Sequence, residues 1–364
     1  PLAGVLAILG LARTEAASSG LIITFNNIPD RVRRQNPDLA AARFRIREAL
    51  GHMRQAGRRP NPEFEAGFEH NTEFREGLVE IGISQRFPVT DRLRMEKDIS
   101  ITELRAAEAE VREVERRLVA EARRNLVDVL AIRQQRELRK AQAAVSQRLA
   151  DFTREVAGRG ELSPIDAGQA KLEATRYSNE IRTLNAAEAA AVGLLKPLLG
   201  MQPNERLNVS GTLPPAILPT GAADPKRRPD YQAAELKTIA AGQNIELEHA
   251  RKYEDIEAGI FAGIERSEDA PEGFDNEGIL AFRVKIPLPL CNKNEGNIEA
   301  AKARHGRKKA EAVALAHSIR HEASAAKTEM IEWNKLIRET TETLIPLAGQ
   351  QADLAETAYR DGQG

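Results

Sequence analysis

A histidine pair and a glycine-rich turn are the features of this sequence that could carry out chemistry. His317 and His321 are one helical turn apart, a spacing at which two imidazoles can bind one metal ion. No third ligand accompanies them, and no glutamate stands between them as in zinc peptidases. Gly158-Arg159-Gly160 has no Lys-Ser/Thr after it and no strand before it, so it is not a phosphate-binding loop. We therefore expect a solvated histidine pair and no metal site.

The rest of the composition excludes several classes of protein. Cys291 is the only cysteine, which rules out an intramolecular disulfide and a cysteine-cluster metal site. A net charge of -1 gives no electrostatic reason to expect nucleic acid binding. No segment approaches the roughly 18 uninterrupted apolar residues of a membrane-spanning helix. Since the carboxylates fall on charged helix faces, we expect a protein that is not an enzyme and has no cofactor.

The stretch from Asp91 to about Gly200 dominates the chain. It contains no proline between Arg92 and Arg159, so its first arm is expected to be one helix about 100 Å long at 1.5 Å per residue. Apolar residues recur there at steps close to the 3.5-residue coiled-coil repeat, with charged residues between them. They are Leu104, Ala107, Val111, Val114, Leu118 and Ala122. The pattern predicts a helix with a narrow apolar seam, too long for a compact core.

The long stretch is interrupted only at Gly158–Pro164. Ser163-Pro164 is typical of an N-cap followed by a first-turn proline, and Asp166 lies in the first turn of the next helix. A second helix is therefore expected to run to about Leu199. The two helices should form a long hairpin with this turn as its tip.

In four segments the apolar residues alternate with polar or small ones, and this two-residue period predicts β-strands. They cover about 64–68, 79–87, 256–264 and 280–288, with a loop expected at 265–278. Their alternation and length of roughly 9 to 11 residues are those of membrane barrel strands. Four strands cannot close a barrel, because closure needs at least about eight. The strands therefore belong either to a barrel built by an oligomer or to an ordinary soluble sheet.

The order of elements occurs twice along the chain. A helix expected from Pro29 to about Arg59 precedes the first two strands and the long hairpin, and an Ala-rich helix from about Pro229 precedes the second pair of strands. Pro88 and Pro287 stand at nearly equal distances before Gly160 and Gly362. The sequence thus predicts an internal two-fold repeat.

Four regions follow from this repeat. Residues 1–19 are expected to be the remnant of an export signal, with a buried N-terminal helix as the alternative. Residues 20–200 form the first repeat, and 201–228 form a Pro-rich connector with a short strand at Leu207–Val209. Residues 229–364 form a second repeat that stops at its helical tip, so the last helix of that repeat is expected to be missing.

Several motifs occur along the chain in an order that resembles a known family. They are Asn36-Pro37-Asp38-Leu39, Pro60-Asn61-Pro62-Glu63-Phe64, Ile286-Pro287-Leu288-Pro289-Leu290 with Asn294-Glu295-Gly296, and Gly160-Glu161-Leu162-Ser163-Pro164-Ile165-Asp166. In order and spacing they resemble the outer-membrane efflux protein family, the TolC-type outer-membrane factors. The resemblance covers about Leu21 to the C-terminus. Its nearest branch serves heavy-metal (cobalt–zinc–cadmium) efflux pumps.

The resemblance implies an architecture, a location and partners. The fold would be mainly α with membrane β: long antiparallel helical hairpins form an α-barrel in the periplasm, and four strands per chain form a 12-stranded β-barrel in a homotrimer. The barrel would contact outer-membrane lipid. A periplasmic adaptor, also called a membrane fusion protein, and an inner-membrane pump would be the other partners.

The resemblance also assigns a role to the tip. Gly160, Leu162, Ser163 and Asp166, with Gly362 in the second repeat, match the positions that meet the adaptor in the family. The alternative is that they are only turn and cap residues. Pro164 and Gly158 depart from the family pattern.

Three functions remain open at this point. The first is a passive exit duct of a tripartite efflux pump, with heavy-metal cations as the cargo that the branch implies. The second is the outer-membrane duct of a type I protein secretion system. The third is a soluble coiled-coil scaffold with small sheets.

Overall fold

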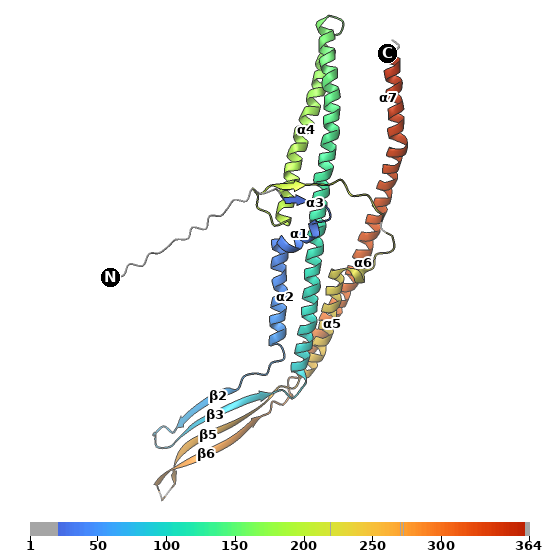
Figure 1. The fold of residues 1–364 in the computed structure, drawn as a ribbon. Coiled ribbons are helices and arrows are strands. Elements are labelled where there is room, and N and C mark those ends of the chain that lie inside the picture. The colour runs from blue at the N-terminus through green and yellow to red at the C-terminus, as the bar shows by residue number, and fades with distance from the viewer. Residues whose placement is uncertain (1–20, 219, 270, 272, 361–364) are drawn as a thin grey trace, which may run out of the picture. The chain divides into compact units, whose positions relative to one another are not determined.

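The computed structural model describes residues 21–218, 220–269, 271 and 273–360 (Figure 1). The described chain is mainly helical and divides into two compact units. The first contains the described residues up to Ala41 together with Val114–Ile217, and the second contains Ala42–Glu113 with the described residues from Leu218 onward. The expected signal remnant, 1–19, and Gly362 lie outside the described residues.

The first unit is built around the helical hairpin of α3 (Arg92–Gly158) and α4 (Pro164–Leu198). α3 contributes its first residues to the second unit and the rest to this one. Both helices begin and end within a residue or two of their expected bounds. The helix ends that were predicted from the positions of glycine and proline are therefore correct.

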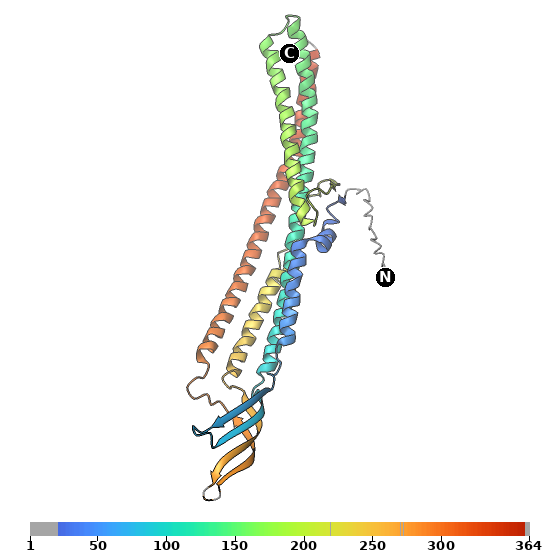
Figure 2. The same ribbon diagram turned by 90° about the vertical axis from the view of Figure 1, so that its left-hand side faces the viewer.

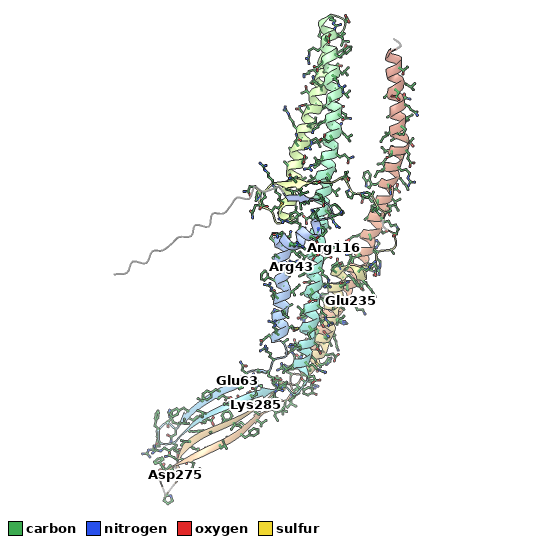
Figure 3. The ribbon with its side chains drawn as sticks, in the orientation of Figure 1. Arg43, Glu63, Arg116, Glu235, Asp275 and Lys285 are labelled. Atoms are coloured by element: carbon green, nitrogen blue, oxygen red, sulfur yellow. The ribbon has the colours of Figure 1, made fainter. Side chains whose placement is uncertain are left out.

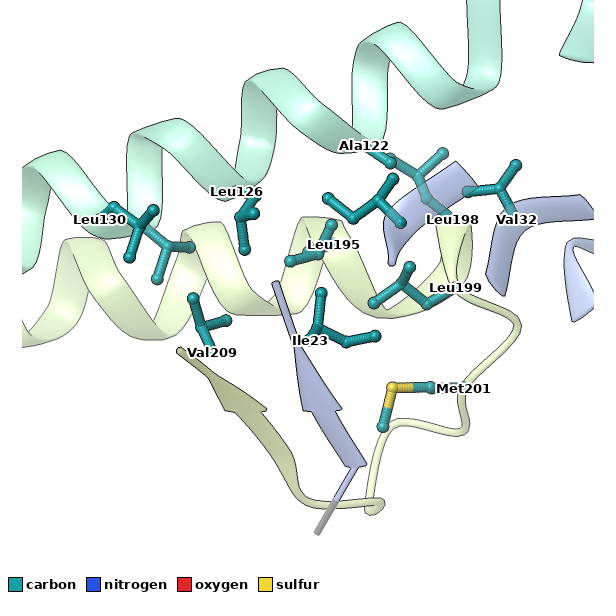
Figure 4. Close-up of a cluster of buried hydrophobic side chains, with 12 residues drawn as sticks. Ile23, Val32, Ala122, Leu126, Leu130, Leu195, Leu198, Leu199, Met201 and Val209 are labelled. Atoms are coloured by element: carbon teal, nitrogen blue, oxygen red, sulfur yellow. The ribbon is translucent and has the colours of Figure 1, made fainter. Parts of the chain in front are cut away.

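Two short strands and a short helix cover the base of this hairpin. β1 (Leu21–Ile23) pairs in parallel with β4 (Leu207–Val209), and α1 (Ile28–Gln35) follows β1. The strand at 207–209 was expected, but its partner was not. Leucines of α3 and α4 point toward the two strands and form a buried core with Ile23 and Val209 (Figure 4). Each fully buried aliphatic side chain contributes about 1.5–3 kcal/mol to the free energy of unfolding.

The end of α4 is fixed by a glycine turn and by α1. Gly200 has φ of 68°, and the amides of Gly200 and Met201 donate to the carbonyls of Pro197 and Lys196, which is a Schellman motif. Arg31 Nε donates to the Leu199 carbonyl over 3.1 Å, and Asn36 Nδ2 donates to the Leu198 carbonyl over 2.9 Å. These two side chains satisfy helix-end carbonyls that would otherwise be unpaired.

The expected helix from Pro29 to about Arg59 is in fact two helices. α1 ends at Gln35, and α2 (Pro37–Gln55) follows after one extended residue, Asn36, with ψ of 124°. The residue before a proline avoids the helical region for steric reasons. Asn36 Oδ1 then accepts a 2.8 Å hydrogen bond from the Leu39 amide and caps the new helix.

The second unit contains a helical layer rich in alanine. α5 (Pro229–Ala250) follows a 3₁₀ turn at Pro225–Arg227 and packs along α6 (Glu295–Glu339), while a π-helical turn at Thr340–Leu344 leads into α7 (Ile345–Arg360). Small side chains are buried where these helices meet, and they permit a close approach of the backbones. They include Ala233, Ala240, Ala241, Ala301, Ala312 and Ala316.

A four-stranded antiparallel sheet completes the second unit (Figure 2). It consists of β2 (Glu63–His70), β3 (Gly77–Phe87), β5 (Ile256–Asp269) and β6 (Gly273–Lys285), in the order β2-β3-β5-β6. The two central strands come from different halves of the sequence. The four expected strands are therefore all present, in one sheet.

The loop expected at 265–278 is mostly strand. Residue pairs continue from Glu265 opposite Glu277 to Asp269 opposite Gly273. The apolar pattern ends at this point, but the backbone ladder needs no apolar side chains to continue. At the other end β6 stops at Lys285 and not at Leu288, because Pro287 and Pro289 have no amide to donate.

Ion pairs hold the junction between the sheet and its helices. The Arg92 guanidinium at the start of α3 binds both carboxylate oxygens of Asp255, the residue before β5. This hydrogen bonding raises the pKa of Arg92 above its ordinary value. On the same helix, the Glu96 carboxylate forms an ion pair with the Arg251 guanidinium, at a distance of 3.3 Å. These charge pairs thus link the first turns of α3 to the connection between α5 and β5.

None of the helices in the part of the chain that the structure describes has an apolar stretch long enough to cross a membrane.

Candidate functional site

The sheet of the second unit has one apolar and one polar face. Phe64, Ile83, Ile260 and Phe282 are paired side by side across the four strands, and all are exposed. Exposed apolar residues continue above and below this row; Leu280 is 79% exposed. At about 25 cal/mol per Å² of apolar surface, such a face is costly to leave in water.

The apolar face covers most of the height of a membrane band. On β3 it runs from Val79 to Phe87, which at about 3.3 Å per residue is about 26 Å along the strand. The row beyond it is polar and contains His70 and Arg266. Strands of membrane β-barrels tilt by about 35–45°, so this length corresponds to about 20 Å of the roughly 25 Å tall lipid-facing band of such barrels.

The opposite face carries charges, glycines and one buried aromatic ring. Figure 3 shows Glu63 and Lys285 at the end of the sheet nearest the helices and Asp275 at the far end. Phe261 is only 6% exposed although it lies on this face. Its ring covers Gly82 and Gly259, where an added Cβ would overlap it.

An arginine locks this ring in place. The Arg283 guanidinium lies 4.2 Å from the centre of the Phe261 ring and donates to both carboxylate oxygens of Glu80, over 2.8 and 2.6 Å. Glu80 in turn packs over Gly67 and Gly263. The cluster of Phe261, Arg283 and Glu80 thus lies across the polar face of the sheet, in the space left by the glycines beneath it.

The cluster of Phe261, Arg283 and Glu80 was not predicted from the sequence. A signal existed, because Phe261 occurs in the polar phase of its strand between Gly259 and Gly263. Aromatic rings over strand glycines are a device that helps to fix the register of neighbouring strands.

The two outer strands have open edges. Within the described residues, β2 pairs only with β3, and β6 pairs only with β5. An edge of this length exposes a row of unpaired backbone N–H and C=O groups, which is a template for pairing with another chain.

The tip of the helical hairpin has the geometry expected from the sequence. Gly160 has φ of 80°, and the amides of Gly160 and Glu161 donate to the carbonyls of Ala157 and Val156, which is a second Schellman motif. Ser163 Oγ accepts a 3.2 Å hydrogen bond from the Ile165 amide and caps α4. The turn therefore needs Gly160 and Ser163 for its own conformation.

The expected tip residues lie close together, as far as they are described. Gly160, Ser163 and Asp166 are exposed, whereas Leu162 is half-buried. Gly362 is outside the described residues. The surface at Gly160 is open, because no heavy atom lies within 4 Å of an added Cβ. The tip thus has room for another molecule.

Below the tip, ion pairs between arginines of α3 and glutamates of α4 help to hold the two helices of the hairpin together. Arg133 Nε binds Glu188 over 2.6 Å, Arg136 binds the same carboxylate, and Arg139 binds Glu180 over 3.0 Å. Apolar residues of α3 spaced like a coiled-coil seam are meanwhile more than half exposed. They are Leu138, Val145, Leu149 and Phe152.

The residues considered for metal chemistry do not form a site. His317 and His321 are exposed on α6, and Cys291 is exposed after β6. Across the described residues, no group of three His, Cys, Asp or Glu side chains is arranged to hold a metal ion.

Comparison with known proteins identifies similar chains. Residues 28–200 match the family model described as outer membrane efflux protein. The cobalt-zinc-cadmium resistance protein CzcC of Cupriavidus metallidurans is 23% identical over 340 residues, which is 90% of this chain and 78% of that one.

Solved structures share the fold. The outer membrane protein VceC from Vibrio cholerae superposes with a TM-score of 0.72 at 20% identity, covering 93% of this chain and 86% of that one. CusC, described as forming a transmembrane channel, gives a TM-score of 0.71 at 18% identity, covering 93% and 83%. The resemblance drawn from the sequence motifs is confirmed.

The Phe261 cluster leads to a stability prediction. Gly82→Ala should lower the free energy of unfolding by about 1–3 kcal/mol, because the new methyl group overlaps the Phe261 ring. Gly278→Ala is the matched control, since it places the same methyl group in open space on β6. Denaturant unfolding of the detergent-solubilised protein measures both.

A double variant tests the cause. In a Phe261→Ala background, Gly82→Ala should cost much less than in the wild type. An equal cost in both backgrounds would show that the ring is not responsible.

Proposed function

Residues 28–200 belong to the outer membrane efflux protein family, and on this basis we propose that the protein is the outer-membrane channel of a tripartite efflux pump. The protein is located in the outer membrane, and its helices extend into the periplasm. The channel is a passive exit duct with no catalytic step of its own. Its cargo is delivered by an inner-membrane pump through a periplasmic adaptor.

The two-faced sheet is the observation that carries the proposal. Its apolar face suits lipid, its polar face suits water, and its two outer edges are open. In a membrane, every backbone polar group must be hydrogen-bonded, which an open sheet cannot achieve. Three copies joined edge to edge, β6 to β2, form a closed 12-stranded barrel with the polar face inside.

The helical arms form the periplasmic part of the duct. The exposed seam of α3, with Leu138, Val145, Leu149 and Phe152, is available to helices of neighbouring copies. The regions 20–200 and 229–364 are two repeats joined by the connector 201–228, and each supplies two strands and one long arm to this trimer.

Heavy-metal cations are the cargo that we propose. The support is the similarity to a protein named for cobalt, zinc and cadmium resistance. The described residues offer no metal-binding cluster that would retain such ions, which suits a duct that only passes them.

Deletion of the gene tests the cargo. We expect the deletion strain to become sensitive to cobalt, zinc or cadmium, and the wild-type gene to restore tolerance, as measured by growth in graded metal concentrations. If metal tolerance is unchanged and a secreted protein instead remains in the cell, the duct serves type I secretion.

The tip at Gly160, Leu162, Ser163 and Asp166, with Gly362 from the second repeat, is the proposed docking site for the adaptor. Asp166→Trp should abolish metal tolerance without loss of the trimer, because an indole on this exposed first turn of α4 prevents close approach of a partner. Ser178→Trp, also exposed but further along α4, is the matched control and should retain tolerance. Normal tolerance with Asp166→Trp would contradict docking at the tip.

The orientation of the sheet can be tested at two adjacent residues. Leu280 lies on the apolar face and Ile279 on the polar face. Leu280→Lys should greatly reduce recovery of SDS-resistant, heat-dissociable trimer from outer membranes, since a lysine facing the middle of the bilayer costs about 2–4 kcal/mol.

Ile279→Lys is the control, because it introduces the same charge on the polar face. We expect it to leave the trimer in the outer-membrane fraction. Equal loss in both variants, or a wild-type protein found as a soluble monomer, would contradict the proposed membrane sheet.

A further inference from the structure

The apolar face of the sheet ends in a polar row at the end far from the helices, where Figure 3 labels Asp275. His70, Gly77, Arg266 and Asn276 lie side by side in this row on β2, β3, β5 and β6. Residues two apart on a strand share a face, so Arg266 lies on the same face as Ile264 in the last apolar row. A basic residue thus marks the boundary of the apolar face on β5.

The Arg266 guanidinium has no carboxylate partner among the described side chains. Arg266 is exposed, and its guanidinium carbon lies 5.1 Å from the centre of the Phe274 ring. The next carboxylate of β5 on this face belongs to Glu268, one row further from the apolar residues. The Glu76 carboxylate is in the polar phase of β3 and accepts a 3.2 Å hydrogen bond from the Glu268 amide. The planar donors of Arg266 therefore remain available to an anion such as phosphate.

Aromatic rings lie at this boundary on both hairpins of the sheet. Phe74, in the loop between β2 and β3, stacks on His70 with the ring centres 3.8 Å apart, and Phe274 lies near the start of β6. Phe74 is 72% exposed and has φ of 56°, which is rare for a bulky residue. The Asn71 carbonyl accepts a 3.0 Å hydrogen bond from the Phe74 amide and holds the turn. In membrane β-barrels, such rings gather where the apolar layer meets the lipid headgroups.

We propose that Arg266 binds a phosphate group of the phosphorylated glycolipid that forms the outer leaflet of the outer membrane. This inference rests on the proposed function, in which the end of the sheet far from the periplasmic helices reaches the outer leaflet. The acyl chains of the lipid lie on the apolar face, and its phosphate meets the guanidinium one row beyond Ile264. Phe274 holds the guanidinium at this level by contact with its ring.

Binding of lipid A to the purified, detergent-solubilised trimer tests this site. The probe is lipid A with its phosphates, compared with the same lipid after enzymatic removal of the phosphates. The wild type should bind the phosphorylated form at least about tenfold more tightly, because hydrogen bonds between a guanidinium and a phosphate are charge-assisted. Native mass spectrometry of the trimer across a lipid titration measures both affinities.

Two variants show whether Arg266 is the cause. Arg266→Gln should remove most of the preference for the phosphorylated lipid, since glutamine has no charge to attract the phosphate. Lys285→Gln is the matched control, because it removes the same charge from an exposed residue on the polar face of β6. We expect it to keep the preference of the wild type.

Three outcomes would overturn the lipid site. They are equal binding of the two lipids by the wild type, an unchanged preference in Arg266→Gln, and displacement of lipid A by inorganic phosphate at equal concentration, which would indicate a site for the free ion. Recovery of the Leu280→Lys trimer from membranes tests the membrane sheet separately. A failure of the lipid site and a failure of the proposed function therefore give different results.

Discussion

Backbone hydrogen bonding at the two open edges of the sheet is the constraint on which the rest of the structure depends. Among the described residues, β2 and β6 each have one unpaired side, and the sheet between them has an exposed apolar face. In lipid no water is present to pair with these groups, and the proposed trimer would pair them with strands of other copies of the chain. The long helical arms face a related requirement, because the exposed seam of α3 also needs other helices to cover it.

The elements with strong local signals could be predicted from the sequence. The absence of proline and glycine fixes the extent of α3, and Ser163-Pro164 fixes the start of α4. The alternation around Ile81 and around Ile260 predicts the strands and their faces correctly. These signals act over a few residues, so no tertiary information is needed to interpret them.

Features that depend on distant residues could not be predicted in this way. Ile23 finds its strand partner, Val209, far along the chain. The paired extension of β5 and β6 beyond Ile264 has no apolar pattern, and the burial of Phe261 depends on Gly82 of the neighbouring strand as well as on Gly259 of its own strand. At the candidate tip, the sequence identifies Gly160 and Ser163 as turn residues, but the docking role that we propose for them depends on a partner that is not part of this chain.

The pairing of β3 with β5 has a consequence for how the chain acquires its structure. Phe87 and Ile256 face each other across roughly 170 residues, so closing that loop costs about 4–5 kcal/mol of chain entropy. The α3–α4 hairpin closes only a short turn, so its contacts are local and it can form first. During export, the first half of the chain would therefore be helical while its strands β2 and β3 remain a lone hairpin, which is only marginally stable in water. The chain becomes competent for the membrane only after its second half has arrived.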